Sequence, residues 1–217
     1  MDSPVLARMM TRRRFGIIDI GMGNLHSVAN AMERVGVQAE SVRSAEGVGS
    51  CTHLILPGVG SFREASTRLD STGIGDAVRD ALREGALLLG ICLGMQLLGS
   101  SSTEDGVSRG LGLIDFDVDK FGPAEVGDAP IPHVGFSRVE APDNQLFNGI
   151  PDRSPFYFVH SYRTRHVAET NWHATAEYGS TFLAAVGVDG VMGTQFHPEK
   201  SQGQGLRLLR NFATLVR

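Results

Sequence analysis

The first 100 residues alternate between short apolar runs and segments with helical spacing, and this alternation limits the possible folds more than any other feature of the sequence. Residues 14–20 and 86–91 are apolar runs typical of buried strands, and shorter runs at 38–42 and 53–56 predict two more. Apolar side chains recur at helical spacing over residues 25–35. Apolar strands separated by helices are typical of a parallel sheet that is covered on both faces.

The boundaries of the helices follow from local signals. Asn24 is expected to cap the helix at 25–35, and Gly36 is expected to end it. Further helices are expected at residues 61–70 and 76–84. The sequence therefore predicts the order strand, helix, strand, strand, helix, helix, strand for its first 91 residues.

Beyond residue 110 the pattern changes to short strand-like runs with little helix between them. We expect strands at residues 111–121, 133–139, 156–162, 172–178, 181–188 and 191–196, and a closing helix at 204–216. The sequence therefore predicts an α/β fold, with a doubly wound, mostly parallel sheet flanked by helices and an antiparallel extension.

The organisation of the chain is expected to be simple. A length of 217 residues allows one domain with a sizeable core, and no internal repeat or low-complexity linker interrupts the pattern. We expect residues 14–217 to form one domain and residues 1–13 to be a disordered N-terminal extension. Met1, Met9 and Met10 all remain candidates for the true start of the chain.

The charged residues exclude several classes of function. The formal net charge is −4, and only two of the basic residues are lysines, Lys120 and Lys200. Neither follows a glycine, so a phosphate-binding P-loop is absent, and the single basic run at 12–14 argues against nucleic-acid binding. No apolar stretch approaches the roughly 20 residues of a membrane span. We expect a cytoplasmic protein with no nucleic-acid or membrane partner and with Cys51 and Cys92 as free thiols.

The segment Gly90-Ile91-Cys92-Leu93-Gly94 joins the 86–91 strand to an apolar helix. This is the spacing of a nucleophile elbow, with cysteine as the nucleophile. We expect the two glycines to accept strained backbone angles and to leave room for the sharp turn. A thiol at a helix N-terminus favours the thiolate, and the same N–H groups can stabilise an oxyanion. A buried structural cysteine in a glycine-rich turn is the alternative.

His197 and Glu199 supply a candidate base for that nucleophile. Residues two apart project to the same side of an extended chain, so Glu199 can accept a hydrogen bond from His197 and fix its tautomer. Pro198 is expected to keep the segment extended. An exposed histidine beside a solvated acid is the alternative. However, both motifs follow predicted strands, at the edge where open α/β sheets bind their ligands.

The turn Pro57-Gly58-Val59-Gly60 also follows a predicted strand. Glycines on both sides of Val59 allow its N–H to turn toward a substrate carbonyl. We therefore expect an oxyanion hole from the backbone N–H groups of Val59 and Leu93, with Gly58 as the flexible neighbour. A plain turn is the alternative.

Taken together, these segments resemble the class I, triad-type glutamine amidotransferases. The segments that carry the resemblance are Pro57-Gly-Val-Gly-Ser-Phe62, Gly90-Ile-Cys-Leu-Gly-Met-Gln96, Phe158-Val-His-Ser-Tyr162 and Gly193-Thr-Gln-Phe-His-Pro-Glu-Lys-Ser-Gln202. Within that family they are most similar to the glutaminase subunits of imidazole glycerol phosphate synthase in histidine biosynthesis. The resemblance extends from Arg14 to the C-terminus.

The resemblance implies a role for each matching residue. Cys92 would attack the side-chain amide of glutamine, His197 would carry the proton, and Glu199 would orient His197. The residues that would hold the glutamine are Gly60, Gln96, His160, Ser161 and Tyr162. No metal and no cofactor is implied, and no cysteine or histidine spacing suits a zinc site.

The resemblance also implies a partner. Ammonia would pass through a channel to a (β/α)8-barrel synthase subunit, and glutaminase activity would stay weak until that partner is loaded. A pivoting Gly58–Val59 peptide could act as the switch. The chain would therefore work as one half of a heterodimer.

Two departures from the family pattern leave the pathway open. Ile20 stands where the family usually has tyrosine, and His133-Val-Gly-Phe-Ser137 replaces the usual His-Met-Gly-Trp-Asn. A paralogous glutaminase subunit that supplies ammonia for amidino-sugar synthesis in surface glycans is the alternative. A partner-independent cysteine hydrolase and a non-catalytic scaffold are two further alternatives.

Overall fold

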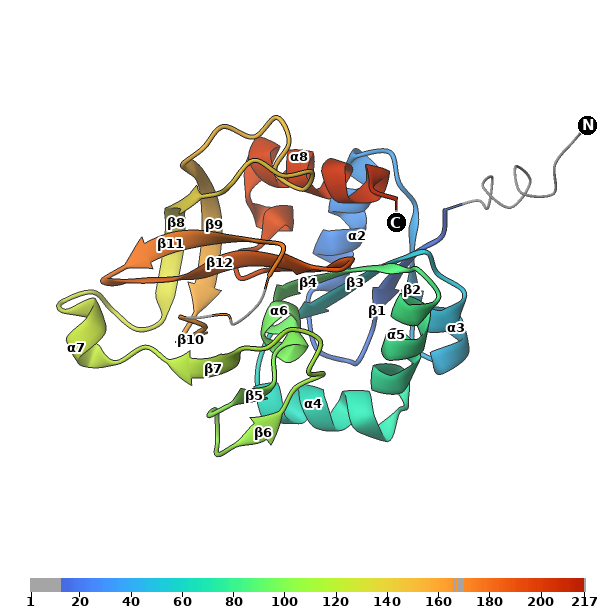
Figure 1. Ribbon diagram of the computed structural model, residues 1–217, viewed down its shortest axis with the longest axis horizontal. Helices are drawn as coiled ribbons and strands as arrows, with labels where there is room; N and C mark the ends of the chain where they lie inside the picture. Colours follow the sequence, from blue (N-terminus) through green and yellow to red (C-terminus); the bar gives the residue numbers. More distant parts are fainter. Residues whose placement is uncertain (1–12, 166, 168–169, 217) are drawn as a thin grey trace, which may run out of the picture.

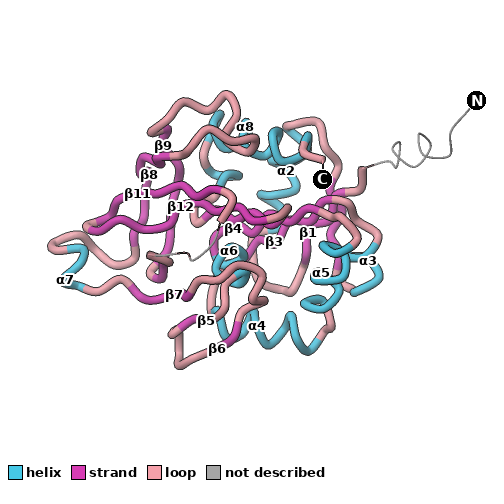
Figure 2. Tube along the Cα trace, in the orientation of Figure 1, coloured by secondary structure: helices cyan, strands magenta, loops and turns pink. Residues whose placement is uncertain are grey.

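A nine-stranded sheet, of which one half is parallel and the other antiparallel, forms the centre of the molecule (Figures 1 and 2). The computed structural model describes residues 13–165, 167 and 170–216. The parallel half runs in the order β2 (Ala39–Val42), β1 (Phe15–Ile18), β3 (His53–Gly58), β4 (Leu87–Cys92) and β13 (Val191–Thr194). The sheet continues with the antiparallel strands β12 (Ser180–Val188), β11 (Trp172–Tyr178), β8 (His133–Glu140) and β9 (Ser154–His160).

Helices cover the parallel half on both faces (Figure 1). One face carries α2 (Leu25–Arg34) and α8 (Gln202–Thr214), and the other carries α3 (Ala45–Gly49), α4 (Phe62–Ser71), α5 (Ile74–Arg83) and α6 (Leu93–Leu98). Alternate residues of β4 belong to the two cores, with Leu87 and Leu89 on the α2–α8 side and Leu88 on the other. Because successive side chains of a strand point to opposite faces, an apolar run such as 86–91 suits a strand that is buried on both sides.

The predicted fold class is confirmed, including the antiparallel extension. Asn24 caps α2 as expected, because its side chain accepts a hydrogen bond of 3.1 Å from the backbone N–H of Ser27. The predicted strand at 172–178 agrees with β11 residue for residue. The long apolar runs therefore predicted the main sheet well.

Three short features differ from the expectation. The helix α3 lies between β2 and β3, where only a loop was expected, and α7 (Pro123–Val126) was also missed. The run at 111–121 contains only the strand β7 (Asp117–Lys120). This strand joins β10 (Tyr162–Arg163), β5 (Ser101–Ser102) and β6 (Ser108–Arg109) in a separate four-stranded sheet that the sequence did not indicate.

Arg13 was assigned to the N-terminal extension, but the structure describes it in contact with the fold. Its guanidinium donates a hydrogen bond of 2.8 Å to the carbonyl of Ala213 in α8. The remaining residues of the predicted extension, 1–12, lie outside the described residues.

Candidate active site

Cys92 lies at the junction of β4 and α6, where the chain turns sharply. Its backbone has φ 55° and ψ −110°, a conformation that residues with a Cβ rarely adopt. A Cβ added to Gly90 would come within 2.6 Å of the carbonyl oxygen of Gly94, and a Cβ on Gly94 would overlap the carbonyl oxygen of Leu56. The expectation that the glycines take the strained angles is therefore wrong. The glycines make room for the turn, and the strain lies at the cysteine itself.

His197 follows β13 and pairs with Glu199. The two side chains are each only 3% exposed, and His197 Nδ1 lies 2.7 Å from Glu199 Oε1. The segment after His197 is not extended as expected, because Pro198–Lys200 forms a 3-10 turn, η1. The pair meets across this turn, and the proline starts the turn at its first position.

The environment of His197 favours its protonated form. Burial of the ring lowers the pKa, but the nearby Cys92 sulfur and the Glu199 carboxylate outweigh burial and raise the pKa of His197 to about 9. Its Nε2 atom is buried and forms no hydrogen bond with any residue that the structure describes. The imidazole therefore carries, at neutral pH, a proton that it can transfer to a leaving group.

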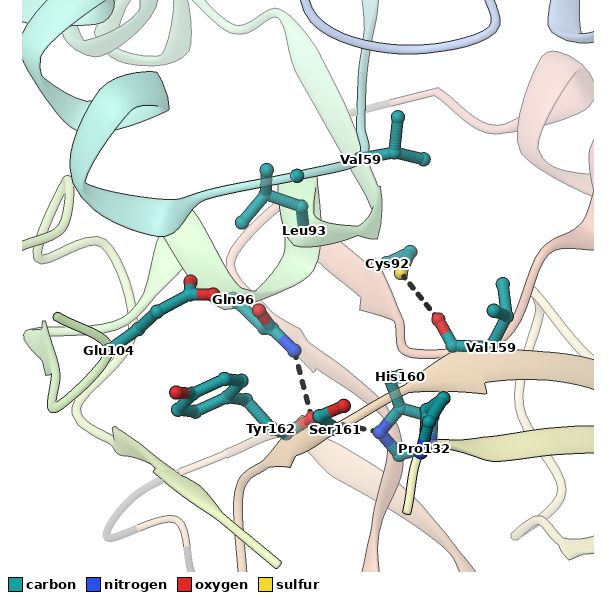
Figure 3. A pocket seen from close by; sticks show the side chains of 11 residues that line it. Val59, Cys92, Leu93, Gln96, Glu104, Pro132, Val159, His160, Ser161 and Tyr162 are labelled. Carbon is teal, nitrogen blue, oxygen red and sulfur yellow. Dashed lines mark hydrogen bonds between the residues drawn. The ribbon is translucent and has the colours of Figure 1, made fainter. Parts of the chain in front are cut away.

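A cavity of about 330 Å³ opens beside the cysteine (Figure 3). Its lining comes from the β3–α4 turn, the elbow with α6, the β5–β6 loop, the loop before β8, and the chain from the end of β9 into β10. The lining residues are Val59, Gly60, Cys92, Leu93, Gln96, Glu104, Pro132, Val159, His160, Ser161 and Tyr162. All five residues that were expected to hold a glutamine lie in this lining. The structure thus brings together residues that are up to 103 positions apart in the chain.

The predicted oxyanion turn meets the elbow. Gly58 is paired with Cys92 in the parallel register of β3 and β4, and a Cβ on Gly58 would lie 3.0 Å from the Cβ of Leu93. Gly60 has φ 101°, and Val59 between the two glycines is 44% exposed. The backbone of this turn therefore lies against the first residue of α6, where an oxyanion hole was expected.

The imidazole of His160 is engaged within the protein. Its Nδ1 lies 2.8 Å from the carbonyl oxygen of Tyr162, and its Nε2 lies 3.1 Å from Nδ1 of His133. Both ring nitrogens are therefore already hydrogen-bonded. His160 lines the cavity, but its ring has no free nitrogen to offer a substrate.

The site contains two polar residues that were not among the predicted site residues. Glu104 lines the cavity, and its Oε2 accepts a hydrogen bond of 2.7 Å from the backbone N–H of Phe62. Gln195 is 1% exposed and lies 3.7 Å from the Cys92 sulfur through its Nε2 atom. Gln195 lies two positions before His197 within the quoted segment Gly193–Gln202, whereas no local pattern indicates Glu104.

The described part of the chain contains no group of three or more His, Cys, Asp or Glu residues arranged to hold a metal ion. Cys51 and Cys92 are both free, and both are buried. Among the described residues, no helix is long and apolar enough to cross a membrane.

Comparisons with known proteins agree with this geometry. The family model for class-I glutamine amidotransferases matches residues 16–216. Imidazole glycerol phosphate synthase subunit HisH of Rhodopirellula baltica is 43% identical over 199 residues, which cover 91% of this chain and 96% of the relative. The protein of the same name from Moorella thermoacetica is 42% identical over 206 residues, covering 94% and 96%.

Solved structures add agreement at the level of the fold. A glutamine amidotransferase crystal structure superposes with a TM-score of 0.69 at 22% identity, covering 93% of this chain and 99% of the other. The structure of PurLQS from Thermotoga maritima also gives a TM-score of 0.69, at 17% identity, covering 92% of this chain and 97% of the other.

Proposed function

Because this chain belongs to the class I glutamine amidotransferase family, we propose that it is the glutaminase subunit of an imidazole glycerol phosphate synthase. Relatives that carry this subunit name are 42–43% identical over more than nine-tenths of the chain. The observation that carries the chemistry is the position of Cys92 on a strained elbow beside the buried His197–Glu199 pair. Residues 14–217 would form the catalytic domain, acting in the cytoplasm.

The first half of the reaction forms a thioester. The Cys92 thiolate attacks the side-chain carbonyl carbon of glutamine, and the backbone N–H groups of Leu93 and Val59 stabilise the oxyanion. When the tetrahedral intermediate collapses, its C–N bond breaks. The Nε2 proton of His197 passes to the departing nitrogen, so the nitrogen leaves as neutral ammonia.

The second half restores the enzyme. Neutral His197 takes a proton from a water molecule as the water oxygen attacks the thioester carbon. The C–S bond breaks, Cys92 leaves as the thiolate, and glutamate is released. Glu199 holds the ring throughout, because its hydrogen bond to Nδ1 keeps Nε2 directed at the reacting atoms.

Polar groups in the cavity suit the two ends of glutamine. The Glu104 carboxylate would bind the α-ammonium group by charge, since only one of its oxygens is occupied by Phe62 N–H. Gln96 uses Nε2 for two hydrogen bonds of 3.0 Å, to Tyr162 O and Gln195 Oε1, so its own Oε1 remains to accept from the ligand. Gly60 and Ser161 complete the lining.

The synthase subunit would dock on the outer face of β8 and β9. Val134 and Phe136 are 56% and 50% exposed there, and Val134 is paired with Val159, whose carbonyl oxygen lies 3.8 Å from the Cys92 sulfur. An exposed apolar patch beside a reactive centre is typical of an interaction site. A (β/α)8 partner on this face would receive the ammonia directly, and its contact could turn the Gly58–Val59 peptide into the active orientation.

Genetic rescue tests the proposal and separates the two pathways. We expect the chain to restore growth without histidine, on low ammonia, to a strain that lacks its glutaminase subunit. Cys92→Ala is the matched control and should fail to restore growth. If the wild-type chain fails while the purified protein still releases glutamate from glutamine with another synthase, the amidino-sugar paralogue is the better assignment.

A further inference from the structure

We propose that Gln195 is a further catalytic residue, whose side-chain amide donates a hydrogen bond to the Cys92 sulfur and stabilises it as a thiolate. The inference rests on the proposed function, because it assigns a role within the same cysteine-dependent reaction. Gln195 follows β13 and lies two residues before His197. The end of one strand would thus supply both the proton donor and a second partner for the nucleophile.

Gln195 is fixed in position from both ends. Its backbone N–H donates a hydrogen bond of 2.8 Å to the carbonyl of Ala184 in β12. In the side chain, Nε2 lies 3.7 Å from Cys92 Sγ, and Oε1 accepts a hydrogen bond of 3.0 Å from Gln96 Nε2. Because the residue is 1% exposed, water does not compete for these contacts.

The orientation of the Gln195 side-chain amide follows from the Tyr162 carbonyl, which can only accept hydrogen bonds. The carbonyl of Tyr162 can only accept, so the Gln96 group 3.0 Å from it must be the NH₂ group. The second hydrogen of that NH₂ group then points to Gln195, which must present its oxygen. The Gln195 NH₂ group is consequently left facing Cys92, and a flipped amide would place two donors against each other.

The Tyr162 carbonyl is itself held by a second chain of hydrogen bonds. His160 Nδ1 must donate to it, so His160 Nε2 accepts from His133 Nδ1, and His133 Nε2 accepts from the Ser137 hydroxyl. This assignment requires both rings to be neutral. Burial lowers the pKa of His133 to about 4 and that of His160 to about 3, which agrees with it. The path from Ser137 on β8 to the Cys92 sulfur is therefore continuous.

A glutamine in this position offers a donor that never titrates. It stabilises negative charge on sulfur both before attack and when the thiolate leaves the thioester. Because the amide carries no net charge, it does not repel protonated His197, as a lysine would. Gln195 therefore adds a hydrogen bond to the thiolate without disturbing the proton donor beside it.

The test is the rate at which iodoacetamide alkylates Cys92 in the purified chain, followed by mass spectrometry between about pH 5 and 9. Gln195→Glu keeps the size of the side chain but replaces the donor with a carboxylate, and we expect Cys92 to react roughly tenfold more slowly at neutral pH. Gln195→Met removes the donor without adding charge, and should slow alkylation about threefold. In both variants the pH profile should move to higher pH.

Controls separate this role from a loss of structure. Gln38→Glu makes the same change at an exposed position just before β2 and should leave the profile unchanged. Cys51 serves as an internal reference, because it is buried outside the active-site cavity that Cys92 lines, and it should become reactive only if the variant unfolds. Gln96→Met should also slow the alkylation of Cys92, because it removes the partner that orients Gln195. The double variant Gln96→Met/Gln195→Met should therefore slow alkylation by less than the product of the two separate effects.

The outcomes are distinguishable. An unchanged Cys92 profile in a folded Gln195→Glu protein would overturn the role of Gln195, whatever substrate the enzyme uses. If the wild-type chain reacts with iodoacetamide but is not labelled by a diazoketone analogue of glutamine, and releases no glutamate with its partner, the proposed function fails instead. The comparison of Gln195 variants with wild type would still stand in that case.

Discussion

Cys92 combines the nucleophile with a backbone conformation that costs free energy. At φ 55° and ψ −110° its Cβ is crowded by the neighbouring peptide groups, and such residues carry about 1–3 kcal/mol of strain. The strain is held in place by close packing, since the approach of α6 to β3 leaves no space for a side chain at Gly94. The elbow therefore depends on one strained residue and two positions without a Cβ.

Replacing Cys92 by glycine or by alanine isolates the strain, because both variants lack the thiol. We expect Cys92→Gly to be more stable than Cys92→Ala by about 1 kcal/mol, since only glycine adopts this conformation without a Cβ clash. Urea unfolding of the two variants measures the difference. At an unstrained position, glycine is less stable than alanine by about 1 kcal/mol. If Cys92→Gly is less stable than Cys92→Ala by that amount, the elbow is not strained.

The spacing Gly90-x-Cys92-x-Gly94 was enough to predict the elbow, but it did not show which residue is strained. The pattern records only where a side chain is excluded. Whether a glycine is needed for its backbone angles or for the space it leaves depends on what packs against it, and that is a property of the tertiary structure.

At the level of secondary structure, the packing of η1 against α8 fixes the position of the His197–Glu199 pair. Gly205 is buried in the first turns of α8, and a Cβ there would overlap the carbonyl oxygen of Pro198. Ser201 joins the two elements, because its hydroxyl donates to the carbonyl of His197 and accepts from the N–H of Tyr157 on β9. The turn that holds Glu199 is therefore clamped between a helix and a strand.

Two glycines in the same helix provide a matched test of this clamp. Gly205→Ala should push η1 away from α8, lowering the free energy of unfolding by about 2 kcal/mol and glutamine turnover at least tenfold. Gly203→Ala is the control, because its Cβ would meet nothing within 4 Å, and it should be neutral or stabilising by about 0.5 kcal/mol. If chemical unfolding and activity assays show the same effect for Gly205→Ala as for Gly203→Ala, the clamp is contradicted.

Elements of the main sheet were predictable because each carries its own apolar signal. The helix α3 and the strands β5 and β6 were missed because they contain five or fewer residues, too few to show a period. The extended conformation expected after His197 was wrong for a related reason. A proline is compatible with both an extended segment and the first position of a turn, and the packing of α8 decides between them.

At the scale of the whole molecule, two buried histidines couple stability to pH. His133 and His160 join β8 to β9 and have pKa values lowered by burial to about 4 and about 3. In the unfolded chain they would titrate near 6.5. Between about pH 4 and 6.5 the unfolded state therefore binds more protons, so stability falls as the pH is lowered through this window.

Removing one ring should reduce this dependence by a known amount. We expect His133→Gln to lower the slope of unfolding free energy against pH by about 1.4 kcal/mol per pH unit between pH 4 and 6.5. His26→Gln is the control, because it makes the same substitution at an exposed position of α2. Denaturant unfolding at a series of pH values provides the slopes. If the free energy of unfolding of His133→Gln changes with pH in parallel with that of the wild type, His133 is not buried in its neutral form.

The sequence predicts the catalytic residues, but it does not predict the hydrogen bonds that hold them in position. Cys92, His197 and Glu199 lie in short motifs at strand ends, where the fold brings them together. The hydrogen-bond path from Ser137 to Cys92 joins residues from six elements or loops, and no spacing along the chain encodes it. Glu104 comes from the loop between β5 and β6, two strands that the sequence pattern does not predict.

The central claim is that Cys92 releases ammonia from glutamine for a partner subunit. The most direct measurement compares glutamine-driven with ammonia-driven product formation by the chain in complex with its ligand-loaded synthase, for the wild type and for Cys92→Ala. We predict that the variant loses glutamine-driven turnover completely and keeps ammonia-driven turnover. Glutamine-driven turnover in Cys92→Ala, or full glutaminase activity of the wild type without any partner, would contradict the claim.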